Sequence, residues 1–348
     1  MIQKIIAKAV GGNHLSENEM IDAMDLIMEG KATPAQIGAL LIALRMKGET
    51  VEEIAGAARV MRAKASAVPT LARNTGQALV DTVGTGGDGA GTFNVSTTTA
   101  FVVAGCGLKV AKHGNRAVSS SCGSADLIEA LGVPLDLEPE RLGECVDRAG
   151  IGFLFAPMLH KAMRHAIGPR REIGLRTIFN LLGPLTNPAG ATVLLVGVYD
   201  RRLVRPLAQV LARLGAESAM VVHGEGGLDE VTITGRTHIA RLFEGEVTEF
   251  EVSPEDMGFD RASLDEIRGG DAQMNLGQTM AVLSGESGPR RDMVLMNAAA
   301  ALVTANKAGD FREGAALAAK SIDSGAAMAR LHDLQAVANG PLMQAAQA

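Results

Sequence analysis

The sequence is poor in aromatic residues, with no tryptophan and a single tyrosine among its 348 residues. Proteins stack single-stranded nucleic acids on aromatic rings, so this scarcity disfavours that class of binding protein. The formal net charge of −6 means that the chain also lacks an overall basic surface for nucleic acid. We therefore expect no nucleic-acid partner, although local basic clusters can still bind a small polyanion.

Cysteine and long apolar runs are scarce too. The three cysteines, Cys106, Cys122 and Cys145, form no C-x-x-C pair. An odd number without that spacing indicates neither a disulfide framework nor a structural zinc site. No apolar run approaches the roughly 20 residues that a membrane-spanning helix needs. We expect a reduced, cytoplasmic protein with no membrane partner.

Residues 1–72 carry the signals of a small helical domain. Ser16 and Thr50 are each followed three residues later by a glutamate, which is the spacing of a capping box. Pro34 follows Thr33 at another helix start. Apolar residues recur at three- and four-residue spacing after each start. The helical pattern returns over about 160–186, and we expect these helices to pack on the first domain.

Residues 73–348 predict a large α/β domain. Short apolar runs alternate with amphipathic stretches, which is typical of a mostly parallel central sheet. The runs that read as buried strands are 78–83, 108–113, 152–156, 191–199 and 218–224. Ligands of such sheets bind at the carboxyl ends of the strands, so the loops after these runs are the candidate binding loops.

The stretch VGTGGDGAGTFNVSTTTA, residues 83–100, satisfies the pattern G-x-G-x-x-G. Five glycines lie within residues 84–91, between an apolar run and a predicted helix start. Free backbone N–H groups and the helix dipole favour an anion at such a place. The pattern is compatible with a dinucleotide site, another phosphate site, or a glycine-rich turn without a ligand.

The following residues favour phosphate over a dinucleotide. A dinucleotide site has an acidic residue about 20 positions further on, to bind the ribose hydroxyls. No Asp or Glu occurs between Asp88 and Asp126, whereas Lys109, Lys112 and Arg116 lie in that interval. No G-K-[ST] follows the glycines, so a P-loop is not indicated either. Asp88 itself fits a ligand with hydroxyls or a cation, or a turn-stabilising aspartate.

A second candidate loop has the sequence AKHGNRAVSSSCGS, residues 111–124. Lys112 and Arg116 supply positive charge, and Asn115 supplies neutral hydrogen-bond donors. The serines at 119–121 and 124 either contact a ligand or cap the next helix. Two such loops at consecutive strand ends predict that one ligand has two phosphate groups.

The pair Asp229-Glu230 lies in a further glycine-rich loop, GEGGLDEV, after a predicted strand. Adjacent carboxylates beside a polyphosphate suggest Mg²⁺, which binds one or two carboxylates together with phosphate oxygens and water. A solvated acidic turn is the alternative. Arg170 and Arg171 offer guanidinium groups that match a carboxylate, or are ordinary surface charges.

These motifs occur together and in order in a known family. The matching segments are GTGGD at 84–88, FNVST at 93–97, KHGNRAVSS at 112–120, RTIFNLLGPLTNP at 176–188 and GLDE at 227–230. Over essentially its whole length, the chain resembles the anthranilate phosphoribosyltransferases of tryptophan biosynthesis. That family transfers the phosphoribosyl group of 5-phospho-α-D-ribose 1-diphosphate (PRPP) to the amine of anthranilate and releases pyrophosphate.

The resemblance implies a role for each matching residue. Asp229, Glu230 and Ser96 would bind Mg²⁺, and Gly84, Asn115 and Arg170 would contact anthranilate. The residues implied around PRPP are Gly84, Gly87, Asp88, Thr92, Asn94, Val95, Ser96, Thr97, Lys112, His113, Gly114, Asn115, Arg116, Ala117, Val118, Ser119, Ser120 and Ser124.

The resemblance also implies a fold and an assembly. The family is similar in fold to pyrimidine nucleoside phosphorylases, with a small helical domain, a large α/β domain and usually a homodimer. Departure of pyrophosphate builds negative charge that Mg²⁺, Lys112 and backbone amides can stabilise. The anthranilate amine is neutral near pH 7 and needs positioning more than a base. We expect no nucleophile or general base, and electrostatic roles for Lys112 and Asn115.

Two alternatives share this fold. A pyrimidine nucleoside phosphorylase would have loops suited to phosphate and a nucleobase, and the KHGNR and GLDE segments argue against it. A non-catalytic nucleic-acid-binding relative would have a strongly basic surface and would lack the metal carboxylates. This chain is acidic and keeps Asp229-Glu230.

Overall fold

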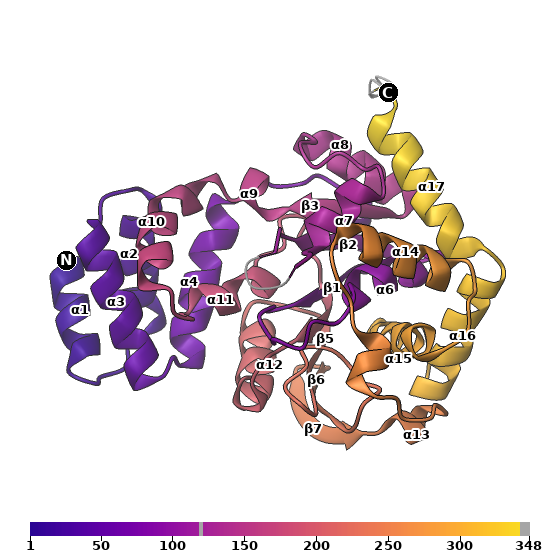
Figure 1. Ribbon diagram of the computed structural model, residues 1–348. Coiled ribbons are helices and arrows are strands. Elements are labelled where there is room, and N and C mark those ends of the chain that lie inside the picture. Colours follow the sequence, from indigo (N-terminus) through magenta and orange to yellow (C-terminus); the bar gives the residue numbers. More distant parts are fainter. Residues whose placement is uncertain (118–120, 342–348) are drawn as a thin grey trace.

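The computed structural model describes residues 1–117 and 121–341, which form a helical unit and a larger unit built on a seven-stranded sheet (Figure 1). The predicted fold class, a small helical domain with a large α/β domain around a mostly parallel sheet, is confirmed. The first helices are α1 (Ile2–Val10), α2 (Glu17–Met28), α3 (Pro34–Lys47) and α4 (Val51–Lys64). The division of the chain at residue 72 stays a prediction.

The remaining elements belong to the sheet, its covering helices and the connection between the units. The strands are β1 (Leu79–Gly84), β2 (Lys109–Gly114), β3 (Ile151–Phe155), β4 (Val193–Gly197), β5 (Ser218–Gly224), β6 (Thr237–Phe243) and β7 (Glu246–Val252). The helices are α5 (Leu71–Asn74), α6 (Val95–Gly105), α7 (Ser124–Ala130), α8 (Pro139–Glu144), α9 (Ala156–Leu159), α10 (Arg164–Ile173), α11 (Phe179–Leu182), α12 (Val204–Arg213), α13 (Pro254–Met257), α14 (Ala272–Leu283), α15 (Pro289–Thr304), α16 (Phe311–Asp323) and α17 (Ala326–Asn339).

The predicted helix starts are present. Ser16 and Thr50 form capping boxes with the glutamates three residues later, and Thr33 caps α3 with Pro34 at its first position. Each cap satisfies backbone N–H groups that the helix leaves unpaired, which stabilises the fold by about 1 kcal/mol. Every helix of the described residues is too short or too polar to span a bilayer.

The sheet has the strand order β3-β2-β1-β4-β5-β6-β7. Strands β1 to β5 run parallel, and β6 and β7 pair antiparallel at one edge. The apolar runs predict β1 to β5 and miss β6 and β7. The chain runs from β1 outward to β2 and β3, and then returns to the other side of β1 with β4. The order therefore reverses between β1 and β4, which is where sheets of this kind bind ligands.

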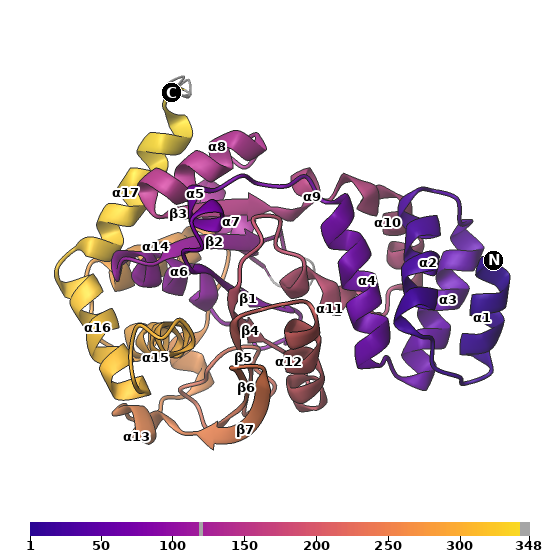
Figure 2. The same ribbon diagram turned by 180° about the vertical axis from the view of Figure 1, so that it is seen from behind.

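Helices cover both faces of the sheet (Figures 1 and 2). Helices α6 and α15 pack on one face, and α12 packs on the other, where it also contacts α4. Alternate residues of β4 belong to different cores: Leu195 packs with the α6 and α15 side, and Leu194 packs with α12 and the helical unit. The helical unit thus shares one hydrophobic core with the sheet.

The chain passes three times between the two units: after α4, after β3 and before β4. Ser66 N–H donates to Leu159 O at 2.8 Å and Val68 N–H to Pro188 O at 3.1 Å, so the first passage lies beside the second and the third. Between the second and third passages, α10 contacts α2 and α3, and α11 contacts α4. Two buried histidines lie at this junction, where the rings of His113 and His160 have centroids 5.1 Å apart.

We predict that this histidine pair makes the fold less stable as the pH falls below about 6.5. Burial lowers the pKa of His160 from 6.5 to about 4; burial and the His160 charge lower the pKa of His113 to about 3. The unfolded chain binds more protons between these values, so folding stability falls with pH across this window. The loss between pH 7 and pH 5 is about 2 kcal/mol for each histidine.

The measurement is the urea midpoint at pH 7 and at pH 5. His160→Gln should show a smaller decrease between the two pH values than the unmodified protein, because one of the two protonations is removed. The control is His332→Gln, which changes an exposed histidine. An equal decrease in all three proteins would contradict the prediction.

Candidate active site

The glycine loop begins at the carboxyl end of β1. Gly86 and Gly87 have φ angles of 68° and 72°, a region that residues with a Cβ disfavour. Gly86 N–H donates to Asp229 Oδ2 at 2.7 Å, which joins the loop to the acidic segment. Asp88 Oδ1 accepts the Ala90 N–H at 3.1 Å, whereas Asp88 Oδ2 is buried without a partner among the described residues. The loop therefore holds a carboxylate oxygen that lacks a donor or cation.

Helix α6 starts where the glycine loop ends. Asn94 precedes the helix without capping it, and its Oδ1 accepts from Asn275 Nδ2 at 2.8 Å. Ser96 N–H donates to Glu230 Oε1 at 3.1 Å. Thr97 is buried, and its hydroxyl has no partner among the described residues. The start of α6 is thus linked to the acidic pair rather than capped by its own side chain.

Lys112, near the end of β2, connects β1 with the start of α6. Its Nζ donates to Thr82 O at 2.6 Å and to Ser96 Oγ at 3.3 Å, and the side chain is 2% exposed. Burial lowers the pKa of Lys112, and the negative charges of Asp81, Glu230 and Asp229 oppose this shift. Lys112 is thus a buried cation facing the same space as the acidic pair.

The acidic pair lies in the loop after β5. Burial, and then the neighbouring Asp88 charge, raise the pKa of Asp229 to about 7. Burial and the Asp229 charge raise the pKa of Glu230 well above its ordinary value. Carboxylates with such shifts lack sufficient positive charge around them. A cation placed beside Asp229 and Glu230 would relieve this repulsion.

Glycines at three strand ends make room for the acidic loop. Gly84 and Gly197 are partners at the ends of β1 and β4. A Cβ on Gly84 would overlap Asp229 Oδ2, and one on Gly197 would overlap the Asp229 carbonyl oxygen. A Cβ on Gly224 would press on the Thr232 side chain and the Glu230 carbonyl oxygen. Absent side chains therefore let the acidic pair reach the β1 and β4 ends.

The second loop is bonded to the start of α7. Asn115 N–H donates to Ser124 Oγ at 3.2 Å, and Ala125 N–H donates to Asn115 O at 3.1 Å. Arg116 was predicted to offer charge to a phosphate, but its guanidinium forms ion pairs with Asp126 and Glu129. The Ala117 N–H donates to Asp126 as well. Three residues predicted in this loop lie outside the described ranges: Val118, Ser119 and Ser120.

Arg170 lies on α10, which packs on the helical unit. Its guanidinium carbon is 5.1 Å from the centre of the Phe179 ring, and burial lowers its pKa. Among the described residues it has no carboxylate or hydrogen-bond partner, and Gly84 and Asn115 are not bonded to it. Arg170 is therefore a partly desolvated cation available to an anionic ligand.

Two further contacts at the site were not predicted from the sequence. Arg176 donates to the Gly87 carbonyl, and its guanidinium carbon lies 4.1 Å from the centre of the Tyr199 ring. Asp81, buried in β1, accepts from the His113 N–H at 3.2 Å and from Asn187 Nδ2 at 2.8 Å. The sequence contained a signal for each contact. Arg176 begins the RTIFN segment, and Asp81 is an acidic residue inside an apolar strand.

No group of three or more His, Cys, Asp or Glu side chains within 1–117 and 121–341 has the arrangement of a metal site. The predicted magnesium ligands are two carboxylates and one hydroxyl, so they include fewer than three such side chains. Carboxylate and hydroxyl oxygens are ligands suited to Mg²⁺ when phosphates and water complete its shell.

Two family models together cover most of the chain. Residues 3–65 match the helical bundle domain of the glycosyl transferase family, and residues 76–328 match its α/β domain. Fold and site thus define a glycosyl transferase. The anthranilate phosphoribosyltransferase of Geotalea daltonii is 54% identical over 97% of this chain and 100% of its own length, and that of Syntrophotalea carbinolica 56% identical over 96% and 98%. The chain belongs to the anthranilate phosphoribosyltransferase family.

Solved structures agree with this assignment. Anthranilate phosphoribosyltransferase from Thermus thermophilus has a TM-score of 0.91 and 43% identity, over 96% of this chain and 99% of that one. The Saccharomyces cerevisiae enzyme in complex with PRPP and Mg has a TM-score of 0.87 and 29% identity, over 97% of both chains. The same enzyme in complex with 4-fluoroanthranilate has a TM-score of 0.83 and 29% identity, over 93% of both chains.

We predict that Gly197→Ala destabilises the protein. Its Cβ would overlap the Asp229 carbonyl oxygen, so backbone must move at the strand end. The free energy of unfolding should fall by roughly 1–3 kcal/mol, the usual effect of overpacking. The control, Gly277→Ala, adds a methyl group to an exposed position of α14 with no atom within 4 Å, and should gain roughly 0.5–1 kcal/mol. Denaturant unfolding measures both, and equal stability of Gly197→Ala and the unmodified protein would refute the overlap.

Proposed function

We propose that this chain transfers the phosphoribosyl group of PRPP to the amine of anthranilate, with release of pyrophosphate, as a step of tryptophan biosynthesis. The observation that carries the proposal is the convergence of β1, the start of α6 and the acidic loop around Lys112. Its Nζ joins Thr82 and Ser96, and Glu230 accepts from the same Ser96. The Lys112 cation and the helix start at Ser96 suit a diphosphate, and the carboxylates suit its metal ion.

PRPP would occupy the space between the glycine loop and the second loop. The residues predicted around it lie in two segments. Residues 84–97 begin at the end of β1, and residues 112–124 begin near the end of β2 and continue into the second loop. The glycine loop offers backbone N–H groups, and Lys112 offers a cation. At the α6 start the Ser96 N–H already donates to Glu230. The Arg116 guanidinium is engaged with Asp126 and Glu129, and its backbone N–H donates to Asn115 Oδ1 at 2.8 Å, so Arg116 would have to exchange one of these bonds to reach a phosphate.

The residues present fit Mg²⁺. Asp88 Oδ2 is a buried oxygen without a partner among the described residues, and the pKa values of Asp229 and Glu230 are raised by burial. Asp229, Glu230 and the Ser96 hydroxyl would hold the ion. When bound, Mg²⁺ supplies charge that stabilises the departing pyrophosphate. The complex of the similar S. cerevisiae enzyme with PRPP and Mg supports this proposal.

Anthranilate would bind between Arg170, Asn115 and Gly84. The guanidinium of Arg170 lacks a partner among the described residues, and a carboxylate is the anion that this group binds best. Asn115 is placed at the end of β2 by its bonds to Ser124 and Ala125. Because Arg170 forms no hydrogen bond with Asn115 or Gly84, the acceptor would bridge α10 and the ends of β1 and β2.

Catalysis would be electrostatic. Lys112 and backbone N–H groups of the glycine loop would stabilise negative charge on the leaving group. Asn115 and Arg170 orient the acceptor amine, which needs no deprotonation to attack. The family assignment does not support the nucleoside phosphorylase or the nucleic-acid-binding alternative. The homodimer and the cytoplasmic location stay predictions.

We predict that replacing both Asp229 by Asn and Glu230 by Gln lowers turnover about a hundred-fold at limiting Mg²⁺. The amide oxygens can keep the bonds to the Gly86 and Ser96 N–H groups. Two desolvated charges disappear, so the melting temperature without ligands should not fall. Loss of anthranilate fluorescence on addition of PRPP and Mg²⁺ measures turnover.

The control for this double variant is Asp136→Asn at an exposed position. It should consume anthranilate at the unmodified rate. Full turnover of the double variant at limiting Mg²⁺ would refute the metal role. An unmodified protein that consumes no anthranilate would refute the proposed reaction itself.

We predict that Arg170→Gln raises the KM for anthranilate about ten-fold, because a charge-assisted hydrogen bond to its carboxylate is lost. The KM for PRPP should stay unchanged. Arg171→Gln is the matched control, since Arg171 is an exposed neighbour on the same helix. Steady-state kinetics with each substrate varied measures both constants. Equal KM values for anthranilate in the two variants would remove Arg170 from the acceptor site.

A further inference from the structure

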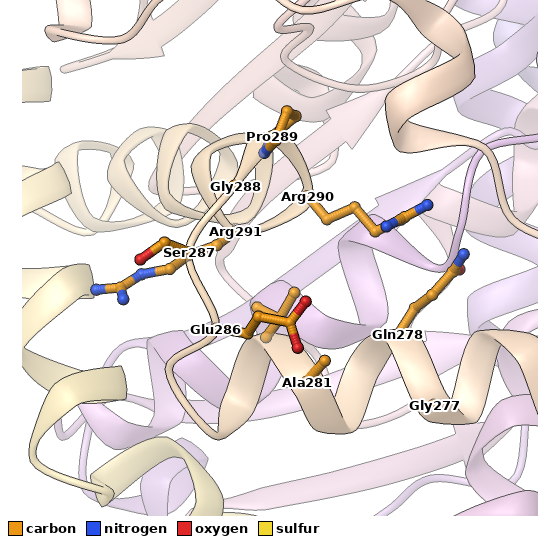
Figure 3. Close-up of a pocket in the computed structure, with 10 residues that line it drawn as sticks. Gly277, Gln278, Ala281, Glu286, Ser287, Gly288, Pro289, Arg290 and Arg291 are labelled. Atoms are coloured by element: carbon orange, nitrogen blue, oxygen red, sulfur yellow. The ribbon is translucent and has the colours of Figure 1, made fainter.

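Helix α14 has buried polar side chains on the face that contacts α6 and the end of the glycine loop. Asn275 and Thr279, one turn apart, are both buried. Thr279 Oγ1 lies 3.1 Å from Thr98 Oγ1 on α6. Gln278 of the same helix (Figure 3) donates from Nε2 to Arg268 O at 3.0 Å. None of these α14 residues is among the predicted site residues, so their bonds indicate what α14 does for the loops beside it.

Asn275 is oriented by a backbone group that can only donate. The Gly270 N–H donates to Asn275 Oδ1 at 2.8 Å. The opposite atom of the Asn275 amide is therefore Nδ2, a donor. The Gly270 carbonyl in turn accepts from Ser121 Oγ at 2.7 Å, in the second loop. The Gly270 peptide thus determines which way the Asn275 amide faces and ties it to the second loop.

The oriented amide of Asn275 fixes the amide of Asn94. Asn275 Nδ2 donates to Asn94 Oδ1 at 2.8 Å, and Cys122 Sγ donates to the same oxygen at 3.4 Å. A rotated Asn94 amide would set two NH2 groups against each other. The Asn94 NH2 group therefore lies on the opposite side, where its one bond among the described residues is a long one, to Cys122 O at 3.4 Å. One N–H of this half-buried side chain is left for a ligand.

Asn275 also competes with the ordinary role of an asparagine at a helix start. Asn94 occupies the position before α6, where an asparagine oxygen usually accepts a backbone N–H of the first turn. Asn94 makes no such bond, because its oxygen accepts from Asn275 instead. The Ser96 N–H of that turn donates to Glu230. The Asn94 amide is thus held for something other than capping the helix.

We propose that Asn275 is a positioning residue for PRPP, an inference that rests on the proposed function. It holds the Asn94 amide with the NH2 group available to an oxygen of PRPP and the carbonyl oxygen turned away. Ionised phosphate oxygens accept hydrogen bonds and do not donate them. An Asn94 amide that faced the other way would therefore set oxygen against oxygen. Asn275 itself does not contact PRPP and acts only through Asn94.

The test is a double-mutant cycle on PRPP binding, measured by calorimetry with Mg²⁺ and without anthranilate. In Asn275→Asp the new carboxylate can still accept from the Gly270 N–H but cannot donate to Asn94, whose NH2 group then turns toward it. We expect Asn275→Asp and Asn94→Ala each to weaken PRPP binding about ten-fold. In the Asn94→Ala background, Asn275→Asp should weaken binding no further, because no amide is left to orient.

Two further variants separate orientation from charge and from folding. Gln273→Glu adds the same charge at an exposed position of α14 and should bind PRPP as the unmodified protein does. Asn275→Leu removes the donor without burying a charge, so it serves if the carboxylate variant does not fold. It should weaken PRPP binding when residue 94 is asparagine and not when it is alanine. The KM for anthranilate should stay unchanged in every variant.

Equal weakening by Asn275→Asp with asparagine and with alanine at position 94 would overturn the proposal, because direct repulsion of PRPP needs no amide. Unchanged PRPP affinity in Asn94→Ala, or in both Asn275 variants, would overturn it too. An unmodified protein that binds no PRPP would contradict the proposed function as well. Binding by the unmodified protein with a failed cycle would remove only the role of Asn275.

Discussion

The candidate site depends on one buried ammonium group. Lys112 is 2% exposed and gives up its hydration, which is costly unless opposite charges surround it. Asp81, Asp229 and Glu230 provide those charges from β1 and from the loop after β5. The ends of three strands and the start of α6 therefore have to meet around Lys112. Three carboxylates against one cation leave an excess of negative charge. This excess adds to the effect of burial in raising the pKa of Asp229 and Glu230, and a divalent ion would compensate it.

This arrangement also requires space at the strand ends. The acidic segment reaches Lys112 only by crossing the ends of β1 and β4, where Gly84 and Gly197 are register partners. Any side chain there would overlap Asp229. The strand order reverses between the same two strands. The place where such sheets bind ligands is therefore also the place where the absent side chains leave room for the acidic loop. The glycines of GTGGD thus serve the acidic loop as much as a phosphate.

Sequence alone predicts the parts of this fold that local chemistry determines. The capping residues and the buried apolar runs gave the first helices and β1 to β5. Strands β6 and β7 were not predicted. Strand β7 is an edge strand with glutamates at 246, 249 and 251, and β6 is interrupted by His238 and Arg241, so neither forms an apolar run. The Arg176–Gly87 and Asp81–Asn187 contacts join residues 89 and 106 positions apart, and no local pattern specifies such pairs. The same holds for Arg116, whose ion pairs depend on where α7 packs.

The donor and acceptor parts of the site belong to different units. The loops around Lys112 are built on the sheet, whereas Arg170 lies on α10, which packs against α2 and α3. The three chain passages, the shared core and side-chain bonds such as Arg62 to Leu214 O fix the distance between them. Arg176 begins the segment that follows α10 and is bonded to the Gly87 carbonyl, so the acceptor helix and the glycine loop are joined directly. A movement of the helical unit would therefore change the acceptor position and the glycine loop together, which couples binding of the two substrates.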